Sequence, residues 1–202
     1  LAELFLIRGG FSKALHFAYE SGDEELFAKI FISSVRKMAA VGRGDLLIKW
    51  AHFAGDDSAQ GEVMKKAIRV VGHLVSSDFK NAEALASELE YIAGLSPEGK
   101  FLFRLSSMVK ANIYFARGDF ERAAQSLDIA LSTLETDDLL DTSDLLALLR
   151  LRARQAFLYD DFTTLAHAYS QAKSLPGDGD PQLNSYQLSC IQSMVLYSEG
   201  RY

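Results

Sequence analysis

The sequence is short of proline, cysteine and positive charge, and each shortage excludes a class of protein. Three prolines among 202 residues are few against a usual frequency of about 5%, which favours long helices because proline interrupts them. A single cysteine, Cys190, excludes an internal disulfide framework and fits a reducing compartment. The net charge of −6 opposes binding to a phosphate backbone, which needs clustered lysine and arginine. We therefore expect this segment to make no contact with nucleic acid.

Long apolar runs and a leader sequence are also missing. The chain has no uninterrupted apolar run of about 18 residues and no N-terminal signal-peptide pattern. Its 49% apolar and 24% charged residues are ordinary for a folded protein with a large core. We expect a cytoplasmic chain without membrane contact. Because the helical pattern is already under way at Leu1, we also expect a fragment of a longer protein.

Motifs of catalysis and metal binding are absent from the sequence. There is no GxxxxGK[ST], GxGxxG, HExxH or GxSxG pattern. The four histidines, His16, His52, His73 and His167, lie far apart without the i, i+4 pairing of a helical metal site. Cys190 lies in LSCIQSM without a basic neighbour, and we interpret it as a small buried hydrophobe. We predict no catalytic residue, no metal, no cofactor and no enzymatic activity.

A three-residue step recurs at a nearly constant spacing. Gly118-Asp119-Phe120, within YFARGDFERAAQSL, is matched by Ser77-Asp78-Phe79, Asp160-Asp161-Phe162 and Gly200-Arg201-Tyr202. The middle residues are 41, 42 and 40 positions apart, and an aromatic residue follows each of them. A spacing this steady indicates a stack of helical hairpins.

The residue types of the step suit a turn between two helices. The first residue ends a helix in a left-handed or otherwise non-helical conformation, and the aspartate can then cap the next helix. We expect the aromatic residue to be buried in the elbow of the hairpin. Truncating Phe120 to alanine would then cost about 3 kcal/mol or more.

The patterning predicts an all-α chain. We expect helices over 2–8, 12–21, 24–41, 45–54, 60–76, 79–94, 99–117, 120–134, 143–159, 162–174 and 182–199, and we expect no strand. Further turns are predicted at Gly9-Gly10-Phe11, Gly22-Asp23 and Gly44-Asp45-Leu46. The hairpins of 1–58 are irregular and those of 59–202 regular, and we expect both to form a single helical-repeat domain over 1–202.

Two stretches resemble known families. YFARGDFERAAQSLDIAL resembles a tetratricopeptide repeat, although the period of about 41 exceeds the usual 34 residues. KALHFAYESGD and RGDLLIKW, which includes Trp50, resemble the region that follows the ATPase and winged-helix parts of LuxR-type transcriptional regulators of the MalT class. The resemblance implies a right-handed superhelix of antiparallel hairpins that senses a signal by receiving a small-molecule effector or a regulatory protein. DNA and ATP would bind elsewhere in the parent chain.

The resemblance also predicts where a ligand or partner would bind. In tetratricopeptide-like arrays the concave groove is lined by the first helix of each hairpin, at about thirteen, ten, six and three residues before its turn. Applied to this sequence, these offsets give the candidate groove residues Asn112, Phe115, Arg150, Arg154, Phe157, Gln187 and Tyr197. Arg150 and Arg154 are four residues apart and share a helix face, where they could hold a carboxylate, a phosphate or the acidic residues of a peptide.

Two alternatives stay open. The arginines would instead be structural if they paired with Asp144, Asp160 or Asp161, which are close in sequence. The array would also be a general protein-interaction scaffold, unrelated to transcription, if the parent chain carried no ATPase and no helix-turn-helix.

Overall fold

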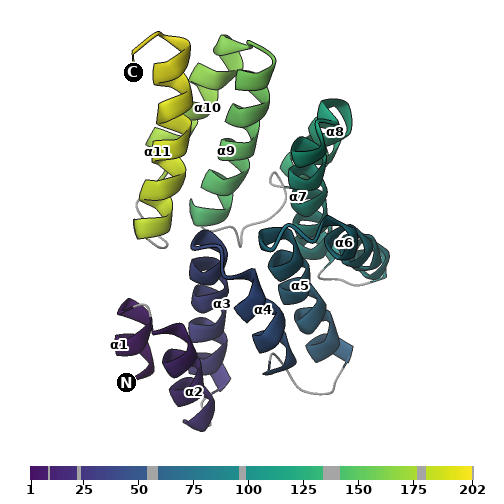
Figure 1. Cartoon of the computed structure of the whole chain (residues 1–202), viewed down its shortest axis with the longest axis vertical. Helices are drawn as coiled ribbons and strands as arrows, with labels where there is room; N and C mark the ends of the chain where they lie inside the picture. Colours follow the sequence, from purple (N-terminus) through teal and green to yellow (C-terminus); the bar gives the residue numbers. More distant parts are fainter. Residues whose placement is uncertain are drawn as a thin grey trace. The chain divides into compact units, whose positions relative to one another are not determined.

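The chain is all-α. The structure, a computed structural model, describes residues 1–8, 10–21, 24–53, 59–95, 99–133, 142–176 and 181–201. Its helices are α1 (Ala2–Ile7), α2 (Phe11–Glu20), α3 (Glu24–Ala40), α4 (Gly44–Trp50), the 3₁₀ helix η1 (Ala51–Phe53), α5 (Ala59–Val75), α6 (Phe79–Ala93), α7 (Gly99–Arg117), α8 (Phe120–Ser132), α9 (Thr142–Leu158), α10 (Phe162–Ser174) and α11 (Pro181–Ser198) (Figure 1). These described ranges contain no strand.

Every predicted helix is present. The observed bounds agree with the predicted ones to within two residues except at 45–54, where α4 ends at Trp50 and η1 follows. The chain divides into two compact units, Leu1–Leu85 and Ala86–Tyr202, and the division falls within α6. That both units form one helical-repeat domain stays a prediction. Of the predicted turn at Gly9-Gly10-Phe11, only Gly9 lies outside the described residues; Gly10 lies between α1 and α2, and its amide donates to the Phe5 carbonyl at 2.8 Å. The predicted turn at Gly22-Asp23 lies wholly outside the described residues.

The four repeated steps close their helices in the same way. Their first residues, Ser77, Gly118, Asp160 and Gly200, have φ angles of 58°, 75°, 54° and 69°. The Gly118 amide donates to the Phe115 carbonyl (3.3 Å), the Asp119 amide donates to the Tyr114 carbonyl (2.9 Å), and the other three steps repeat both bonds. This pair of bonds around a left-handed residue is the Schellman motif, which satisfies the last carbonyls of a helix. The predicted non-helical ends are confirmed, and all four are left-handed.

A fifth corner of this kind lies two residues before the predicted turn at Gly44-Asp45. Gly42 has a φ of 76°, and the Arg43 amide donates to the Met38 carbonyl at 2.8 Å. Gly44 is instead the first residue of α4. A Cβ atom there would lie 2.3 Å from the Gly72 carbonyl oxygen and 2.3 Å from Ser76 Oγ. The prediction mistook a glycine required by the contact between α4 and α5 for the glycine required by the turn.

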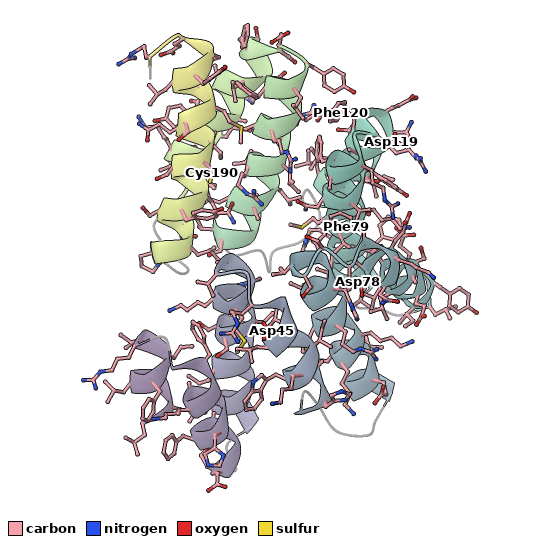
Figure 2. All side chains as sticks on the ribbon, viewed as in Figure 1. Asp45, Asp78, Phe79, Asp119, Phe120 and Cys190 are labelled. Atoms are coloured by element: carbon pink, nitrogen blue, oxygen red, sulfur yellow. The ribbon has the colours of Figure 1, made fainter. Side chains whose placement is uncertain are left out.

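Aspartates cap the helices that follow three of the corners. The backbone N–H groups of Arg122 and Thr164 donate to Asp119 and Asp161 at 3.3 and 3.0 Å, and Asn81 donates to Asp78 at 3.4 Å. The predicted caps are therefore confirmed. In Figure 2, Asp119 lies at the turn between α7 and α8, beside Phe120.

The corner aromatics are not buried as predicted. Phe120 is 37% exposed and Phe162 is 49% exposed. Phe120 extends the buried stripe of Ala123 and Leu127, but it is the first residue of α8, where solvent reaches the end of the hairpin. Its ring contacts Phe115 at a centroid distance of 6.4 Å and Tyr159 at 6.3 Å. The loss of 3 kcal/mol expected for a fully buried phenylalanine therefore does not apply.

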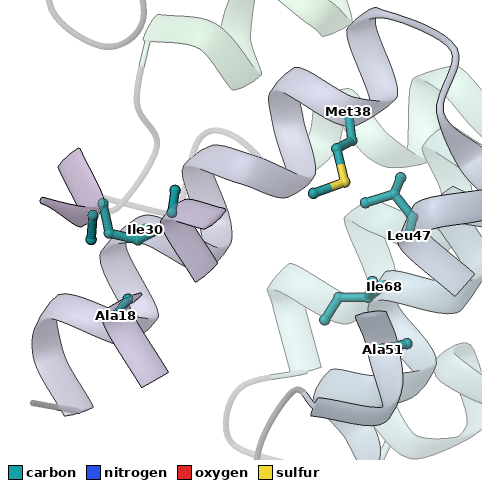
Figure 3. Packing of buried hydrophobic residues seen from close by; sticks show 8 residues of the cluster. Ala18, Ile30, Met38, Leu47, Ala51 and Ile68 are labelled. Atoms are coloured by element: carbon teal, nitrogen blue, oxygen red, sulfur yellow. The ribbon is translucent and has the colours of Figure 1, made fainter. Parts of the chain in front are cut away.

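The first unit has a core of small and aliphatic side chains. Met38 of α3, Leu47 of α4 and Ile68 of α5 point toward one another in Figure 3, and all three are buried. Ala14 and Ala18 extend this cluster to α2. Alanines at these positions allow the helix backbones to approach closely.

In the second unit α9 is packed on two sides. Leu148 and Leu151 join a cluster with Ala111, Phe115 and Leu127 of α7 and α8. Leu146, Leu149, Ala153 and Ala156 join another cluster, with Leu165 of α10 and Ile191 of α11. These two buried faces leave α9 only narrow stripes for polar side chains, and the candidate site lies on one of them.

Candidate functional site

The site is built on the stripe of α9 between its two buried faces. Ala147, Arg150, Arg154 and Phe157 repeat at helical spacing, and all four are half-buried. Helix α7 contributes to the cluster on one side of α9, and α11 contributes to the cluster on the other. Long polar side chains of this stripe therefore run over apolar surface before they reach solvent.

Arg154 lies over an aromatic ring of α7. Its guanidinium carbon is 5.1 Å from the centroid of the Phe115 ring, which is a cation–π distance. Phe115 is itself only 4% exposed and belongs to the core. Burial, and next the positive charge of Arg150, lower the pKa of Arg154 from its usual value. Arg154 is thus partly dehydrated, and Arg150 lies one helical turn before it on the same face of α9.

Arg150 carries a buried N–H group that has no acceptor. Its Nε atom is inaccessible to solvent and forms no hydrogen bond. Within the described residues neither Arg150 nor Arg154 forms an ion pair. By contrast, Arg152 on the same helix donates to the Asp128 carboxylate and to Gln155 Oε1, both at 2.9 Å.

Two of the three suggested structural carboxylates, Asp160 and Asp161, form no ion pair with these arginines. Asp161 caps α10 through Thr164, and Asp160 occupies the left-handed position of the corner. The side chain of Asp144 lies outside the described residues. Two positive charges therefore lie together without a counter-charge from any described residue.

Two contacts fix the register between α9 and α11. Ser143 Oγ donates to Asn184 Oδ1 at 2.8 Å, and the Phe157 and Tyr197 rings meet edge to face at a centroid distance of 5.5 Å. In both pairs the residue number on α11 is 40 or 41 higher than that of its partner on α9. The two helices therefore run parallel with a nearly constant offset. Position 190 is then level with Arg150. Cys190 is half-buried on α11, not buried as predicted, and α11 runs alongside α9 (Figure 2).

Gln187 lies one helical turn before position 190 and is only 7% exposed. Its Oε1 atom is buried and has no donor. Tyr197 of α11, which contacts Phe157 at the other end of the α9 stripe, is 60% exposed. Asn112 differs from both, because its Nδ2 donates to the Met108 carbonyl of its own helix at 2.9 Å.

The structure therefore links the predicted site residues in two small groups. Phe115, Arg154 and Arg150 form one, and Phe157 and Tyr197 form the other, whereas Asn112 is satisfied within α7. The sequence did not single out a small hollow of about 150 Å³ lined by Arg152, Gln155, Ala156, Tyr159, Asp161 and Thr164. Its arginine already has a carboxylate partner in Asp128.

The site offers groups that suit the binding of an anion. Guanidiniums donate hydrogen bonds in a fixed planar geometry that matches carboxylates and phosphates. Among the described residues, no three or more His, Cys, Asp or Glu side chains come together as a metal site requires. No helix in the described ranges combines the length and apolar character that a membrane crossing demands.

Comparisons with known proteins add no further assignment. No protein-family model matches the chain, and neither a curated protein nor a solved structure matches it. The resemblance to LuxR-type regulators of the MalT class therefore rests on the sequence stretches that carry it.

Proposed function

We propose that the chain is the signal-sensing region of a LuxR-type regulator of the MalT class, and that it binds an anionic group at Arg150 and Arg154. One observation carries the binding proposal: two half-buried arginines lie one helical turn apart on the same face of α9 without a carboxylate partner from the described residues. In this proposal the hairpins form a right-handed superhelix, and α7, α9 and α11 line its concave groove. The chain is not an enzyme.

Arg150 and Arg154 carry positive charges that no carboxylate of the described residues balances. Bringing a charged group out of water is unfavourable unless it gains a partner, and Arg150 and Arg154 also repel each other. A bound carboxylate or phosphate would supply the missing negative charge and accept from guanidinium N–H groups. Each hydrogen bond to a charged group stabilises by about 1.5–3 kcal/mol. The site is therefore completed by its ligand.

A general scaffold that docks an acidic peptide is the second candidate. Exposed Tyr197 extends the stripe beyond Phe157, and an aromatic next to cations suits an extended partner. The gene that encodes the parent chain separates the two readings. A phosphate-binding loop before this segment and a helix-turn-helix after it would support the regulator, and their absence would support the scaffold.

The binding proposal is tested by thermal unfolding with sulfate, phosphate, dicarboxylates and sugar phosphates at constant ionic strength. Anions that raise Tm are then titrated by calorimetry into the wild type and into the Arg150→Gln, Arg154→Gln double variant. We expect saturable stabilisation, worth about 2.7 kcal/mol at a ligand concentration 100 times Kd, that is lost in the double variant. Stabilisation that persists in the double variant would place the anion elsewhere.

Arg152→Gln is the matched control, because it removes the same charge from the same helix where a carboxylate partner already exists. We expect this variant to bind anions like the wild type. Without ligand, the double variant should unfold within about 1 kcal/mol of the wild type, since it loses a cation–π contact but also a repulsion. A much larger loss would show that the two arginines are structural. If no small anion binds, an acidic peptide takes their place in the same titration.

A further inference from the structure

We infer that the small hollow between α9 and α10 binds a small-molecule ligand through an alkylguanidinium group. The hollow has a volume of about 150 Å³, and Tyr159 and Asp161 are among its lining residues. One water needs only about 10–15 Å³ of such space, so the hollow has room for a larger group. The inference does not depend on the anion site, because neither Arg150 nor Arg154 lines this hollow.

The corner between α7 and α8 shows how this fold holds a guanidinium. There the Arg122 side chain donates to the carboxylate of Asp119, the residue that caps α8. The guanidinium carbon of Arg122 also lies over the Tyr114 ring, 4.9 Å from its centroid. A carboxylate beside an aromatic face suits a cation through charge-assisted hydrogen bonds and cation–π attraction. This corner therefore supplies its own cation.

The corner between α9 and α10 has the same cap without the cation. Asp161, 42 positions after Asp119, caps α10 by accepting from the Thr164 amide at 3.0 Å. Thr164 is the counterpart of Arg122, and its side chain carries no charge. Within the described residues Asp161 forms no ion pair. The capping carboxylate of this corner is thus open to a cation from outside the chain.

Smaller side chains leave space where the first corner is filled. Ala156 stands at the position that corresponds to Tyr114, and Thr164 at the position that corresponds to Arg122. Both Ala156 and Thr164 line the hollow. The hollow therefore lies where the other corner places its arginine and the ring beneath it.

An aromatic ring is present here too, but it comes from another position. Tyr159 lines the hollow and is 54% exposed. Its ring meets the Phe120 ring of α8 edge to face at a centroid distance of 6.3 Å, which holds it at the corner. A guanidinium in the hollow would thus find both partners that Arg122 has, a carboxylate and an aromatic ring.

Arg152 also lines the hollow, and its charge opposes a second cation. However, Arg152 donates to the Asp128 carboxylate and to Gln155 Oε1, both at 2.9 Å, so its charge is already balanced. Asp161 then leaves the hollow with one negative charge in excess. The competing occupant is an anion held by Arg152, and the experiment includes that case.

The experiment titrates ethylguanidinium into the isotope-labelled 202-residue chain and follows the NMR signal of the residue 164 amide, which bonds Asp161. Ethylurea is the matched neutral probe, because it has nearly the same shape without the charge, and phosphate is the anionic probe. Asp161→Asn keeps an oxygen for the cap and removes the charge. Thr164→Arg restores the internal cation of the other corner. Thr163→Arg adds the same charge at an exposed neighbouring position and is the control.

We expect a saturable shift with ethylguanidinium, and none with ethylurea, in the wild type and in Thr163→Arg. Asp161→Asn should raise Kd about threefold or more, and Thr164→Arg should abolish binding because its own guanidinium fills the hollow. If Thr164→Arg does not fold, Asp161→Asn carries the test.

Three results would overturn the inference. They are the absence of a saturable shift with ethylguanidinium in the wild type, equal binding of ethylurea, and an unchanged Kd in Asp161→Asn. Saturation by phosphate in place of ethylguanidinium would assign the hollow to an anion at Arg152 instead.

Discussion

The corners at Gly42-Arg43 and at Gly118-Asp119 share one backbone and differ in their side chains. Both place a left-handed residue first and form the same pair of hydrogen bonds to the preceding helix. Only Asp119 caps the helix that follows, whereas Arg43 makes no cap and pairs with Asp45. The left-handed residue therefore determines the corner, and a corner can form without a side-chain cap on the next helix.

We expect the largest loss of stability at Gly44, where a side chain would collide with α5, and smaller losses at the glycines of the corners. A Cβ atom at Gly44 would lie 2.3 Å from the Gly72 carbonyl oxygen, whereas one at Gly42 or Gly118 would meet nothing within 4 Å. We expect Gly44→Ala to lower the free energy of unfolding by about 3 kcal/mol, because α4 and α5 must move apart. Urea denaturation measures it. A loss below about 1 kcal/mol would show that the helices tolerate the extra methyl group.

The corner glycine gives the next largest effect. Gly118→Ala meets no steric neighbour but places a Cβ in the left-handed region, so we expect a loss of about 1–2 kcal/mol. The complementary change is Asp160→Gly, which removes the same strain and should stabilise by about 0.5–1 kcal/mol. Urea denaturation of both variants provides the comparison. Equal signs for the two changes would contradict the shared role of these positions.

The caps should contribute less than the corner glycine. Asp119→Ala removes the acceptor for the Arg122 amide and should lower Tm by less than Gly118→Ala does. Arg43→Ser supplies a capping hydroxyl where none acts now and should raise Tm slightly. Differential scanning calorimetry of both variants measures the two shifts. A Tm unchanged by Asp119→Ala would mean that the corner alone holds α8 in place.

The smallest effect concerns pH. The Thr164 hydroxyl, and next its backbone N–H, hold the pKa of Asp161 below its usual 3.8. A carboxyl whose pKa is lower in the folded state contributes stability that is fully present above its unfolded pKa and is lost as pH falls through its folded pKa. Stability measured between pH 6 and pH 2.5 should therefore fall less steeply for Asp161→Asn, which keeps the cap without the titration, than for the wild type. Identical slopes would refute this contribution.

Local chemistry explains why the helices and corners were predictable. Left-handed residues such as Gly118 and Asp160 and capping aspartates such as Asp119 act within a few residues of the chain, so the sequence displays them directly. Gly44 was misassigned because its constraint comes from Gly72, 28 positions away. The exposure of Phe120 likewise depends on what covers the end of a hairpin.

The candidate site was predictable only in part. Spacing alone placed Arg150 and Arg154 on one face, and the structure adds that this face lies between two buried ones. The burial of Gln187 had no local signal, because it arises where α11 packs against α9. Phe115 was predicted as a groove residue from its offset, and the structure places it in the core beneath Arg154.

The central claim, that an anion binds beside Arg150 and Arg154, is tested most directly by the alkylation rate of Cys190. This half-buried thiol is the only cysteine of the chain and lies on α11 at the level of Arg150. Saturating anion should slow its reaction with iodoacetamide in the wild type and in Arg152→Gln, and should leave the rate unchanged in the Arg150→Gln, Arg154→Gln variant. An unchanged rate in wild-type protein that calorimetry shows to be saturated would contradict the claim, because the anion would then lie elsewhere.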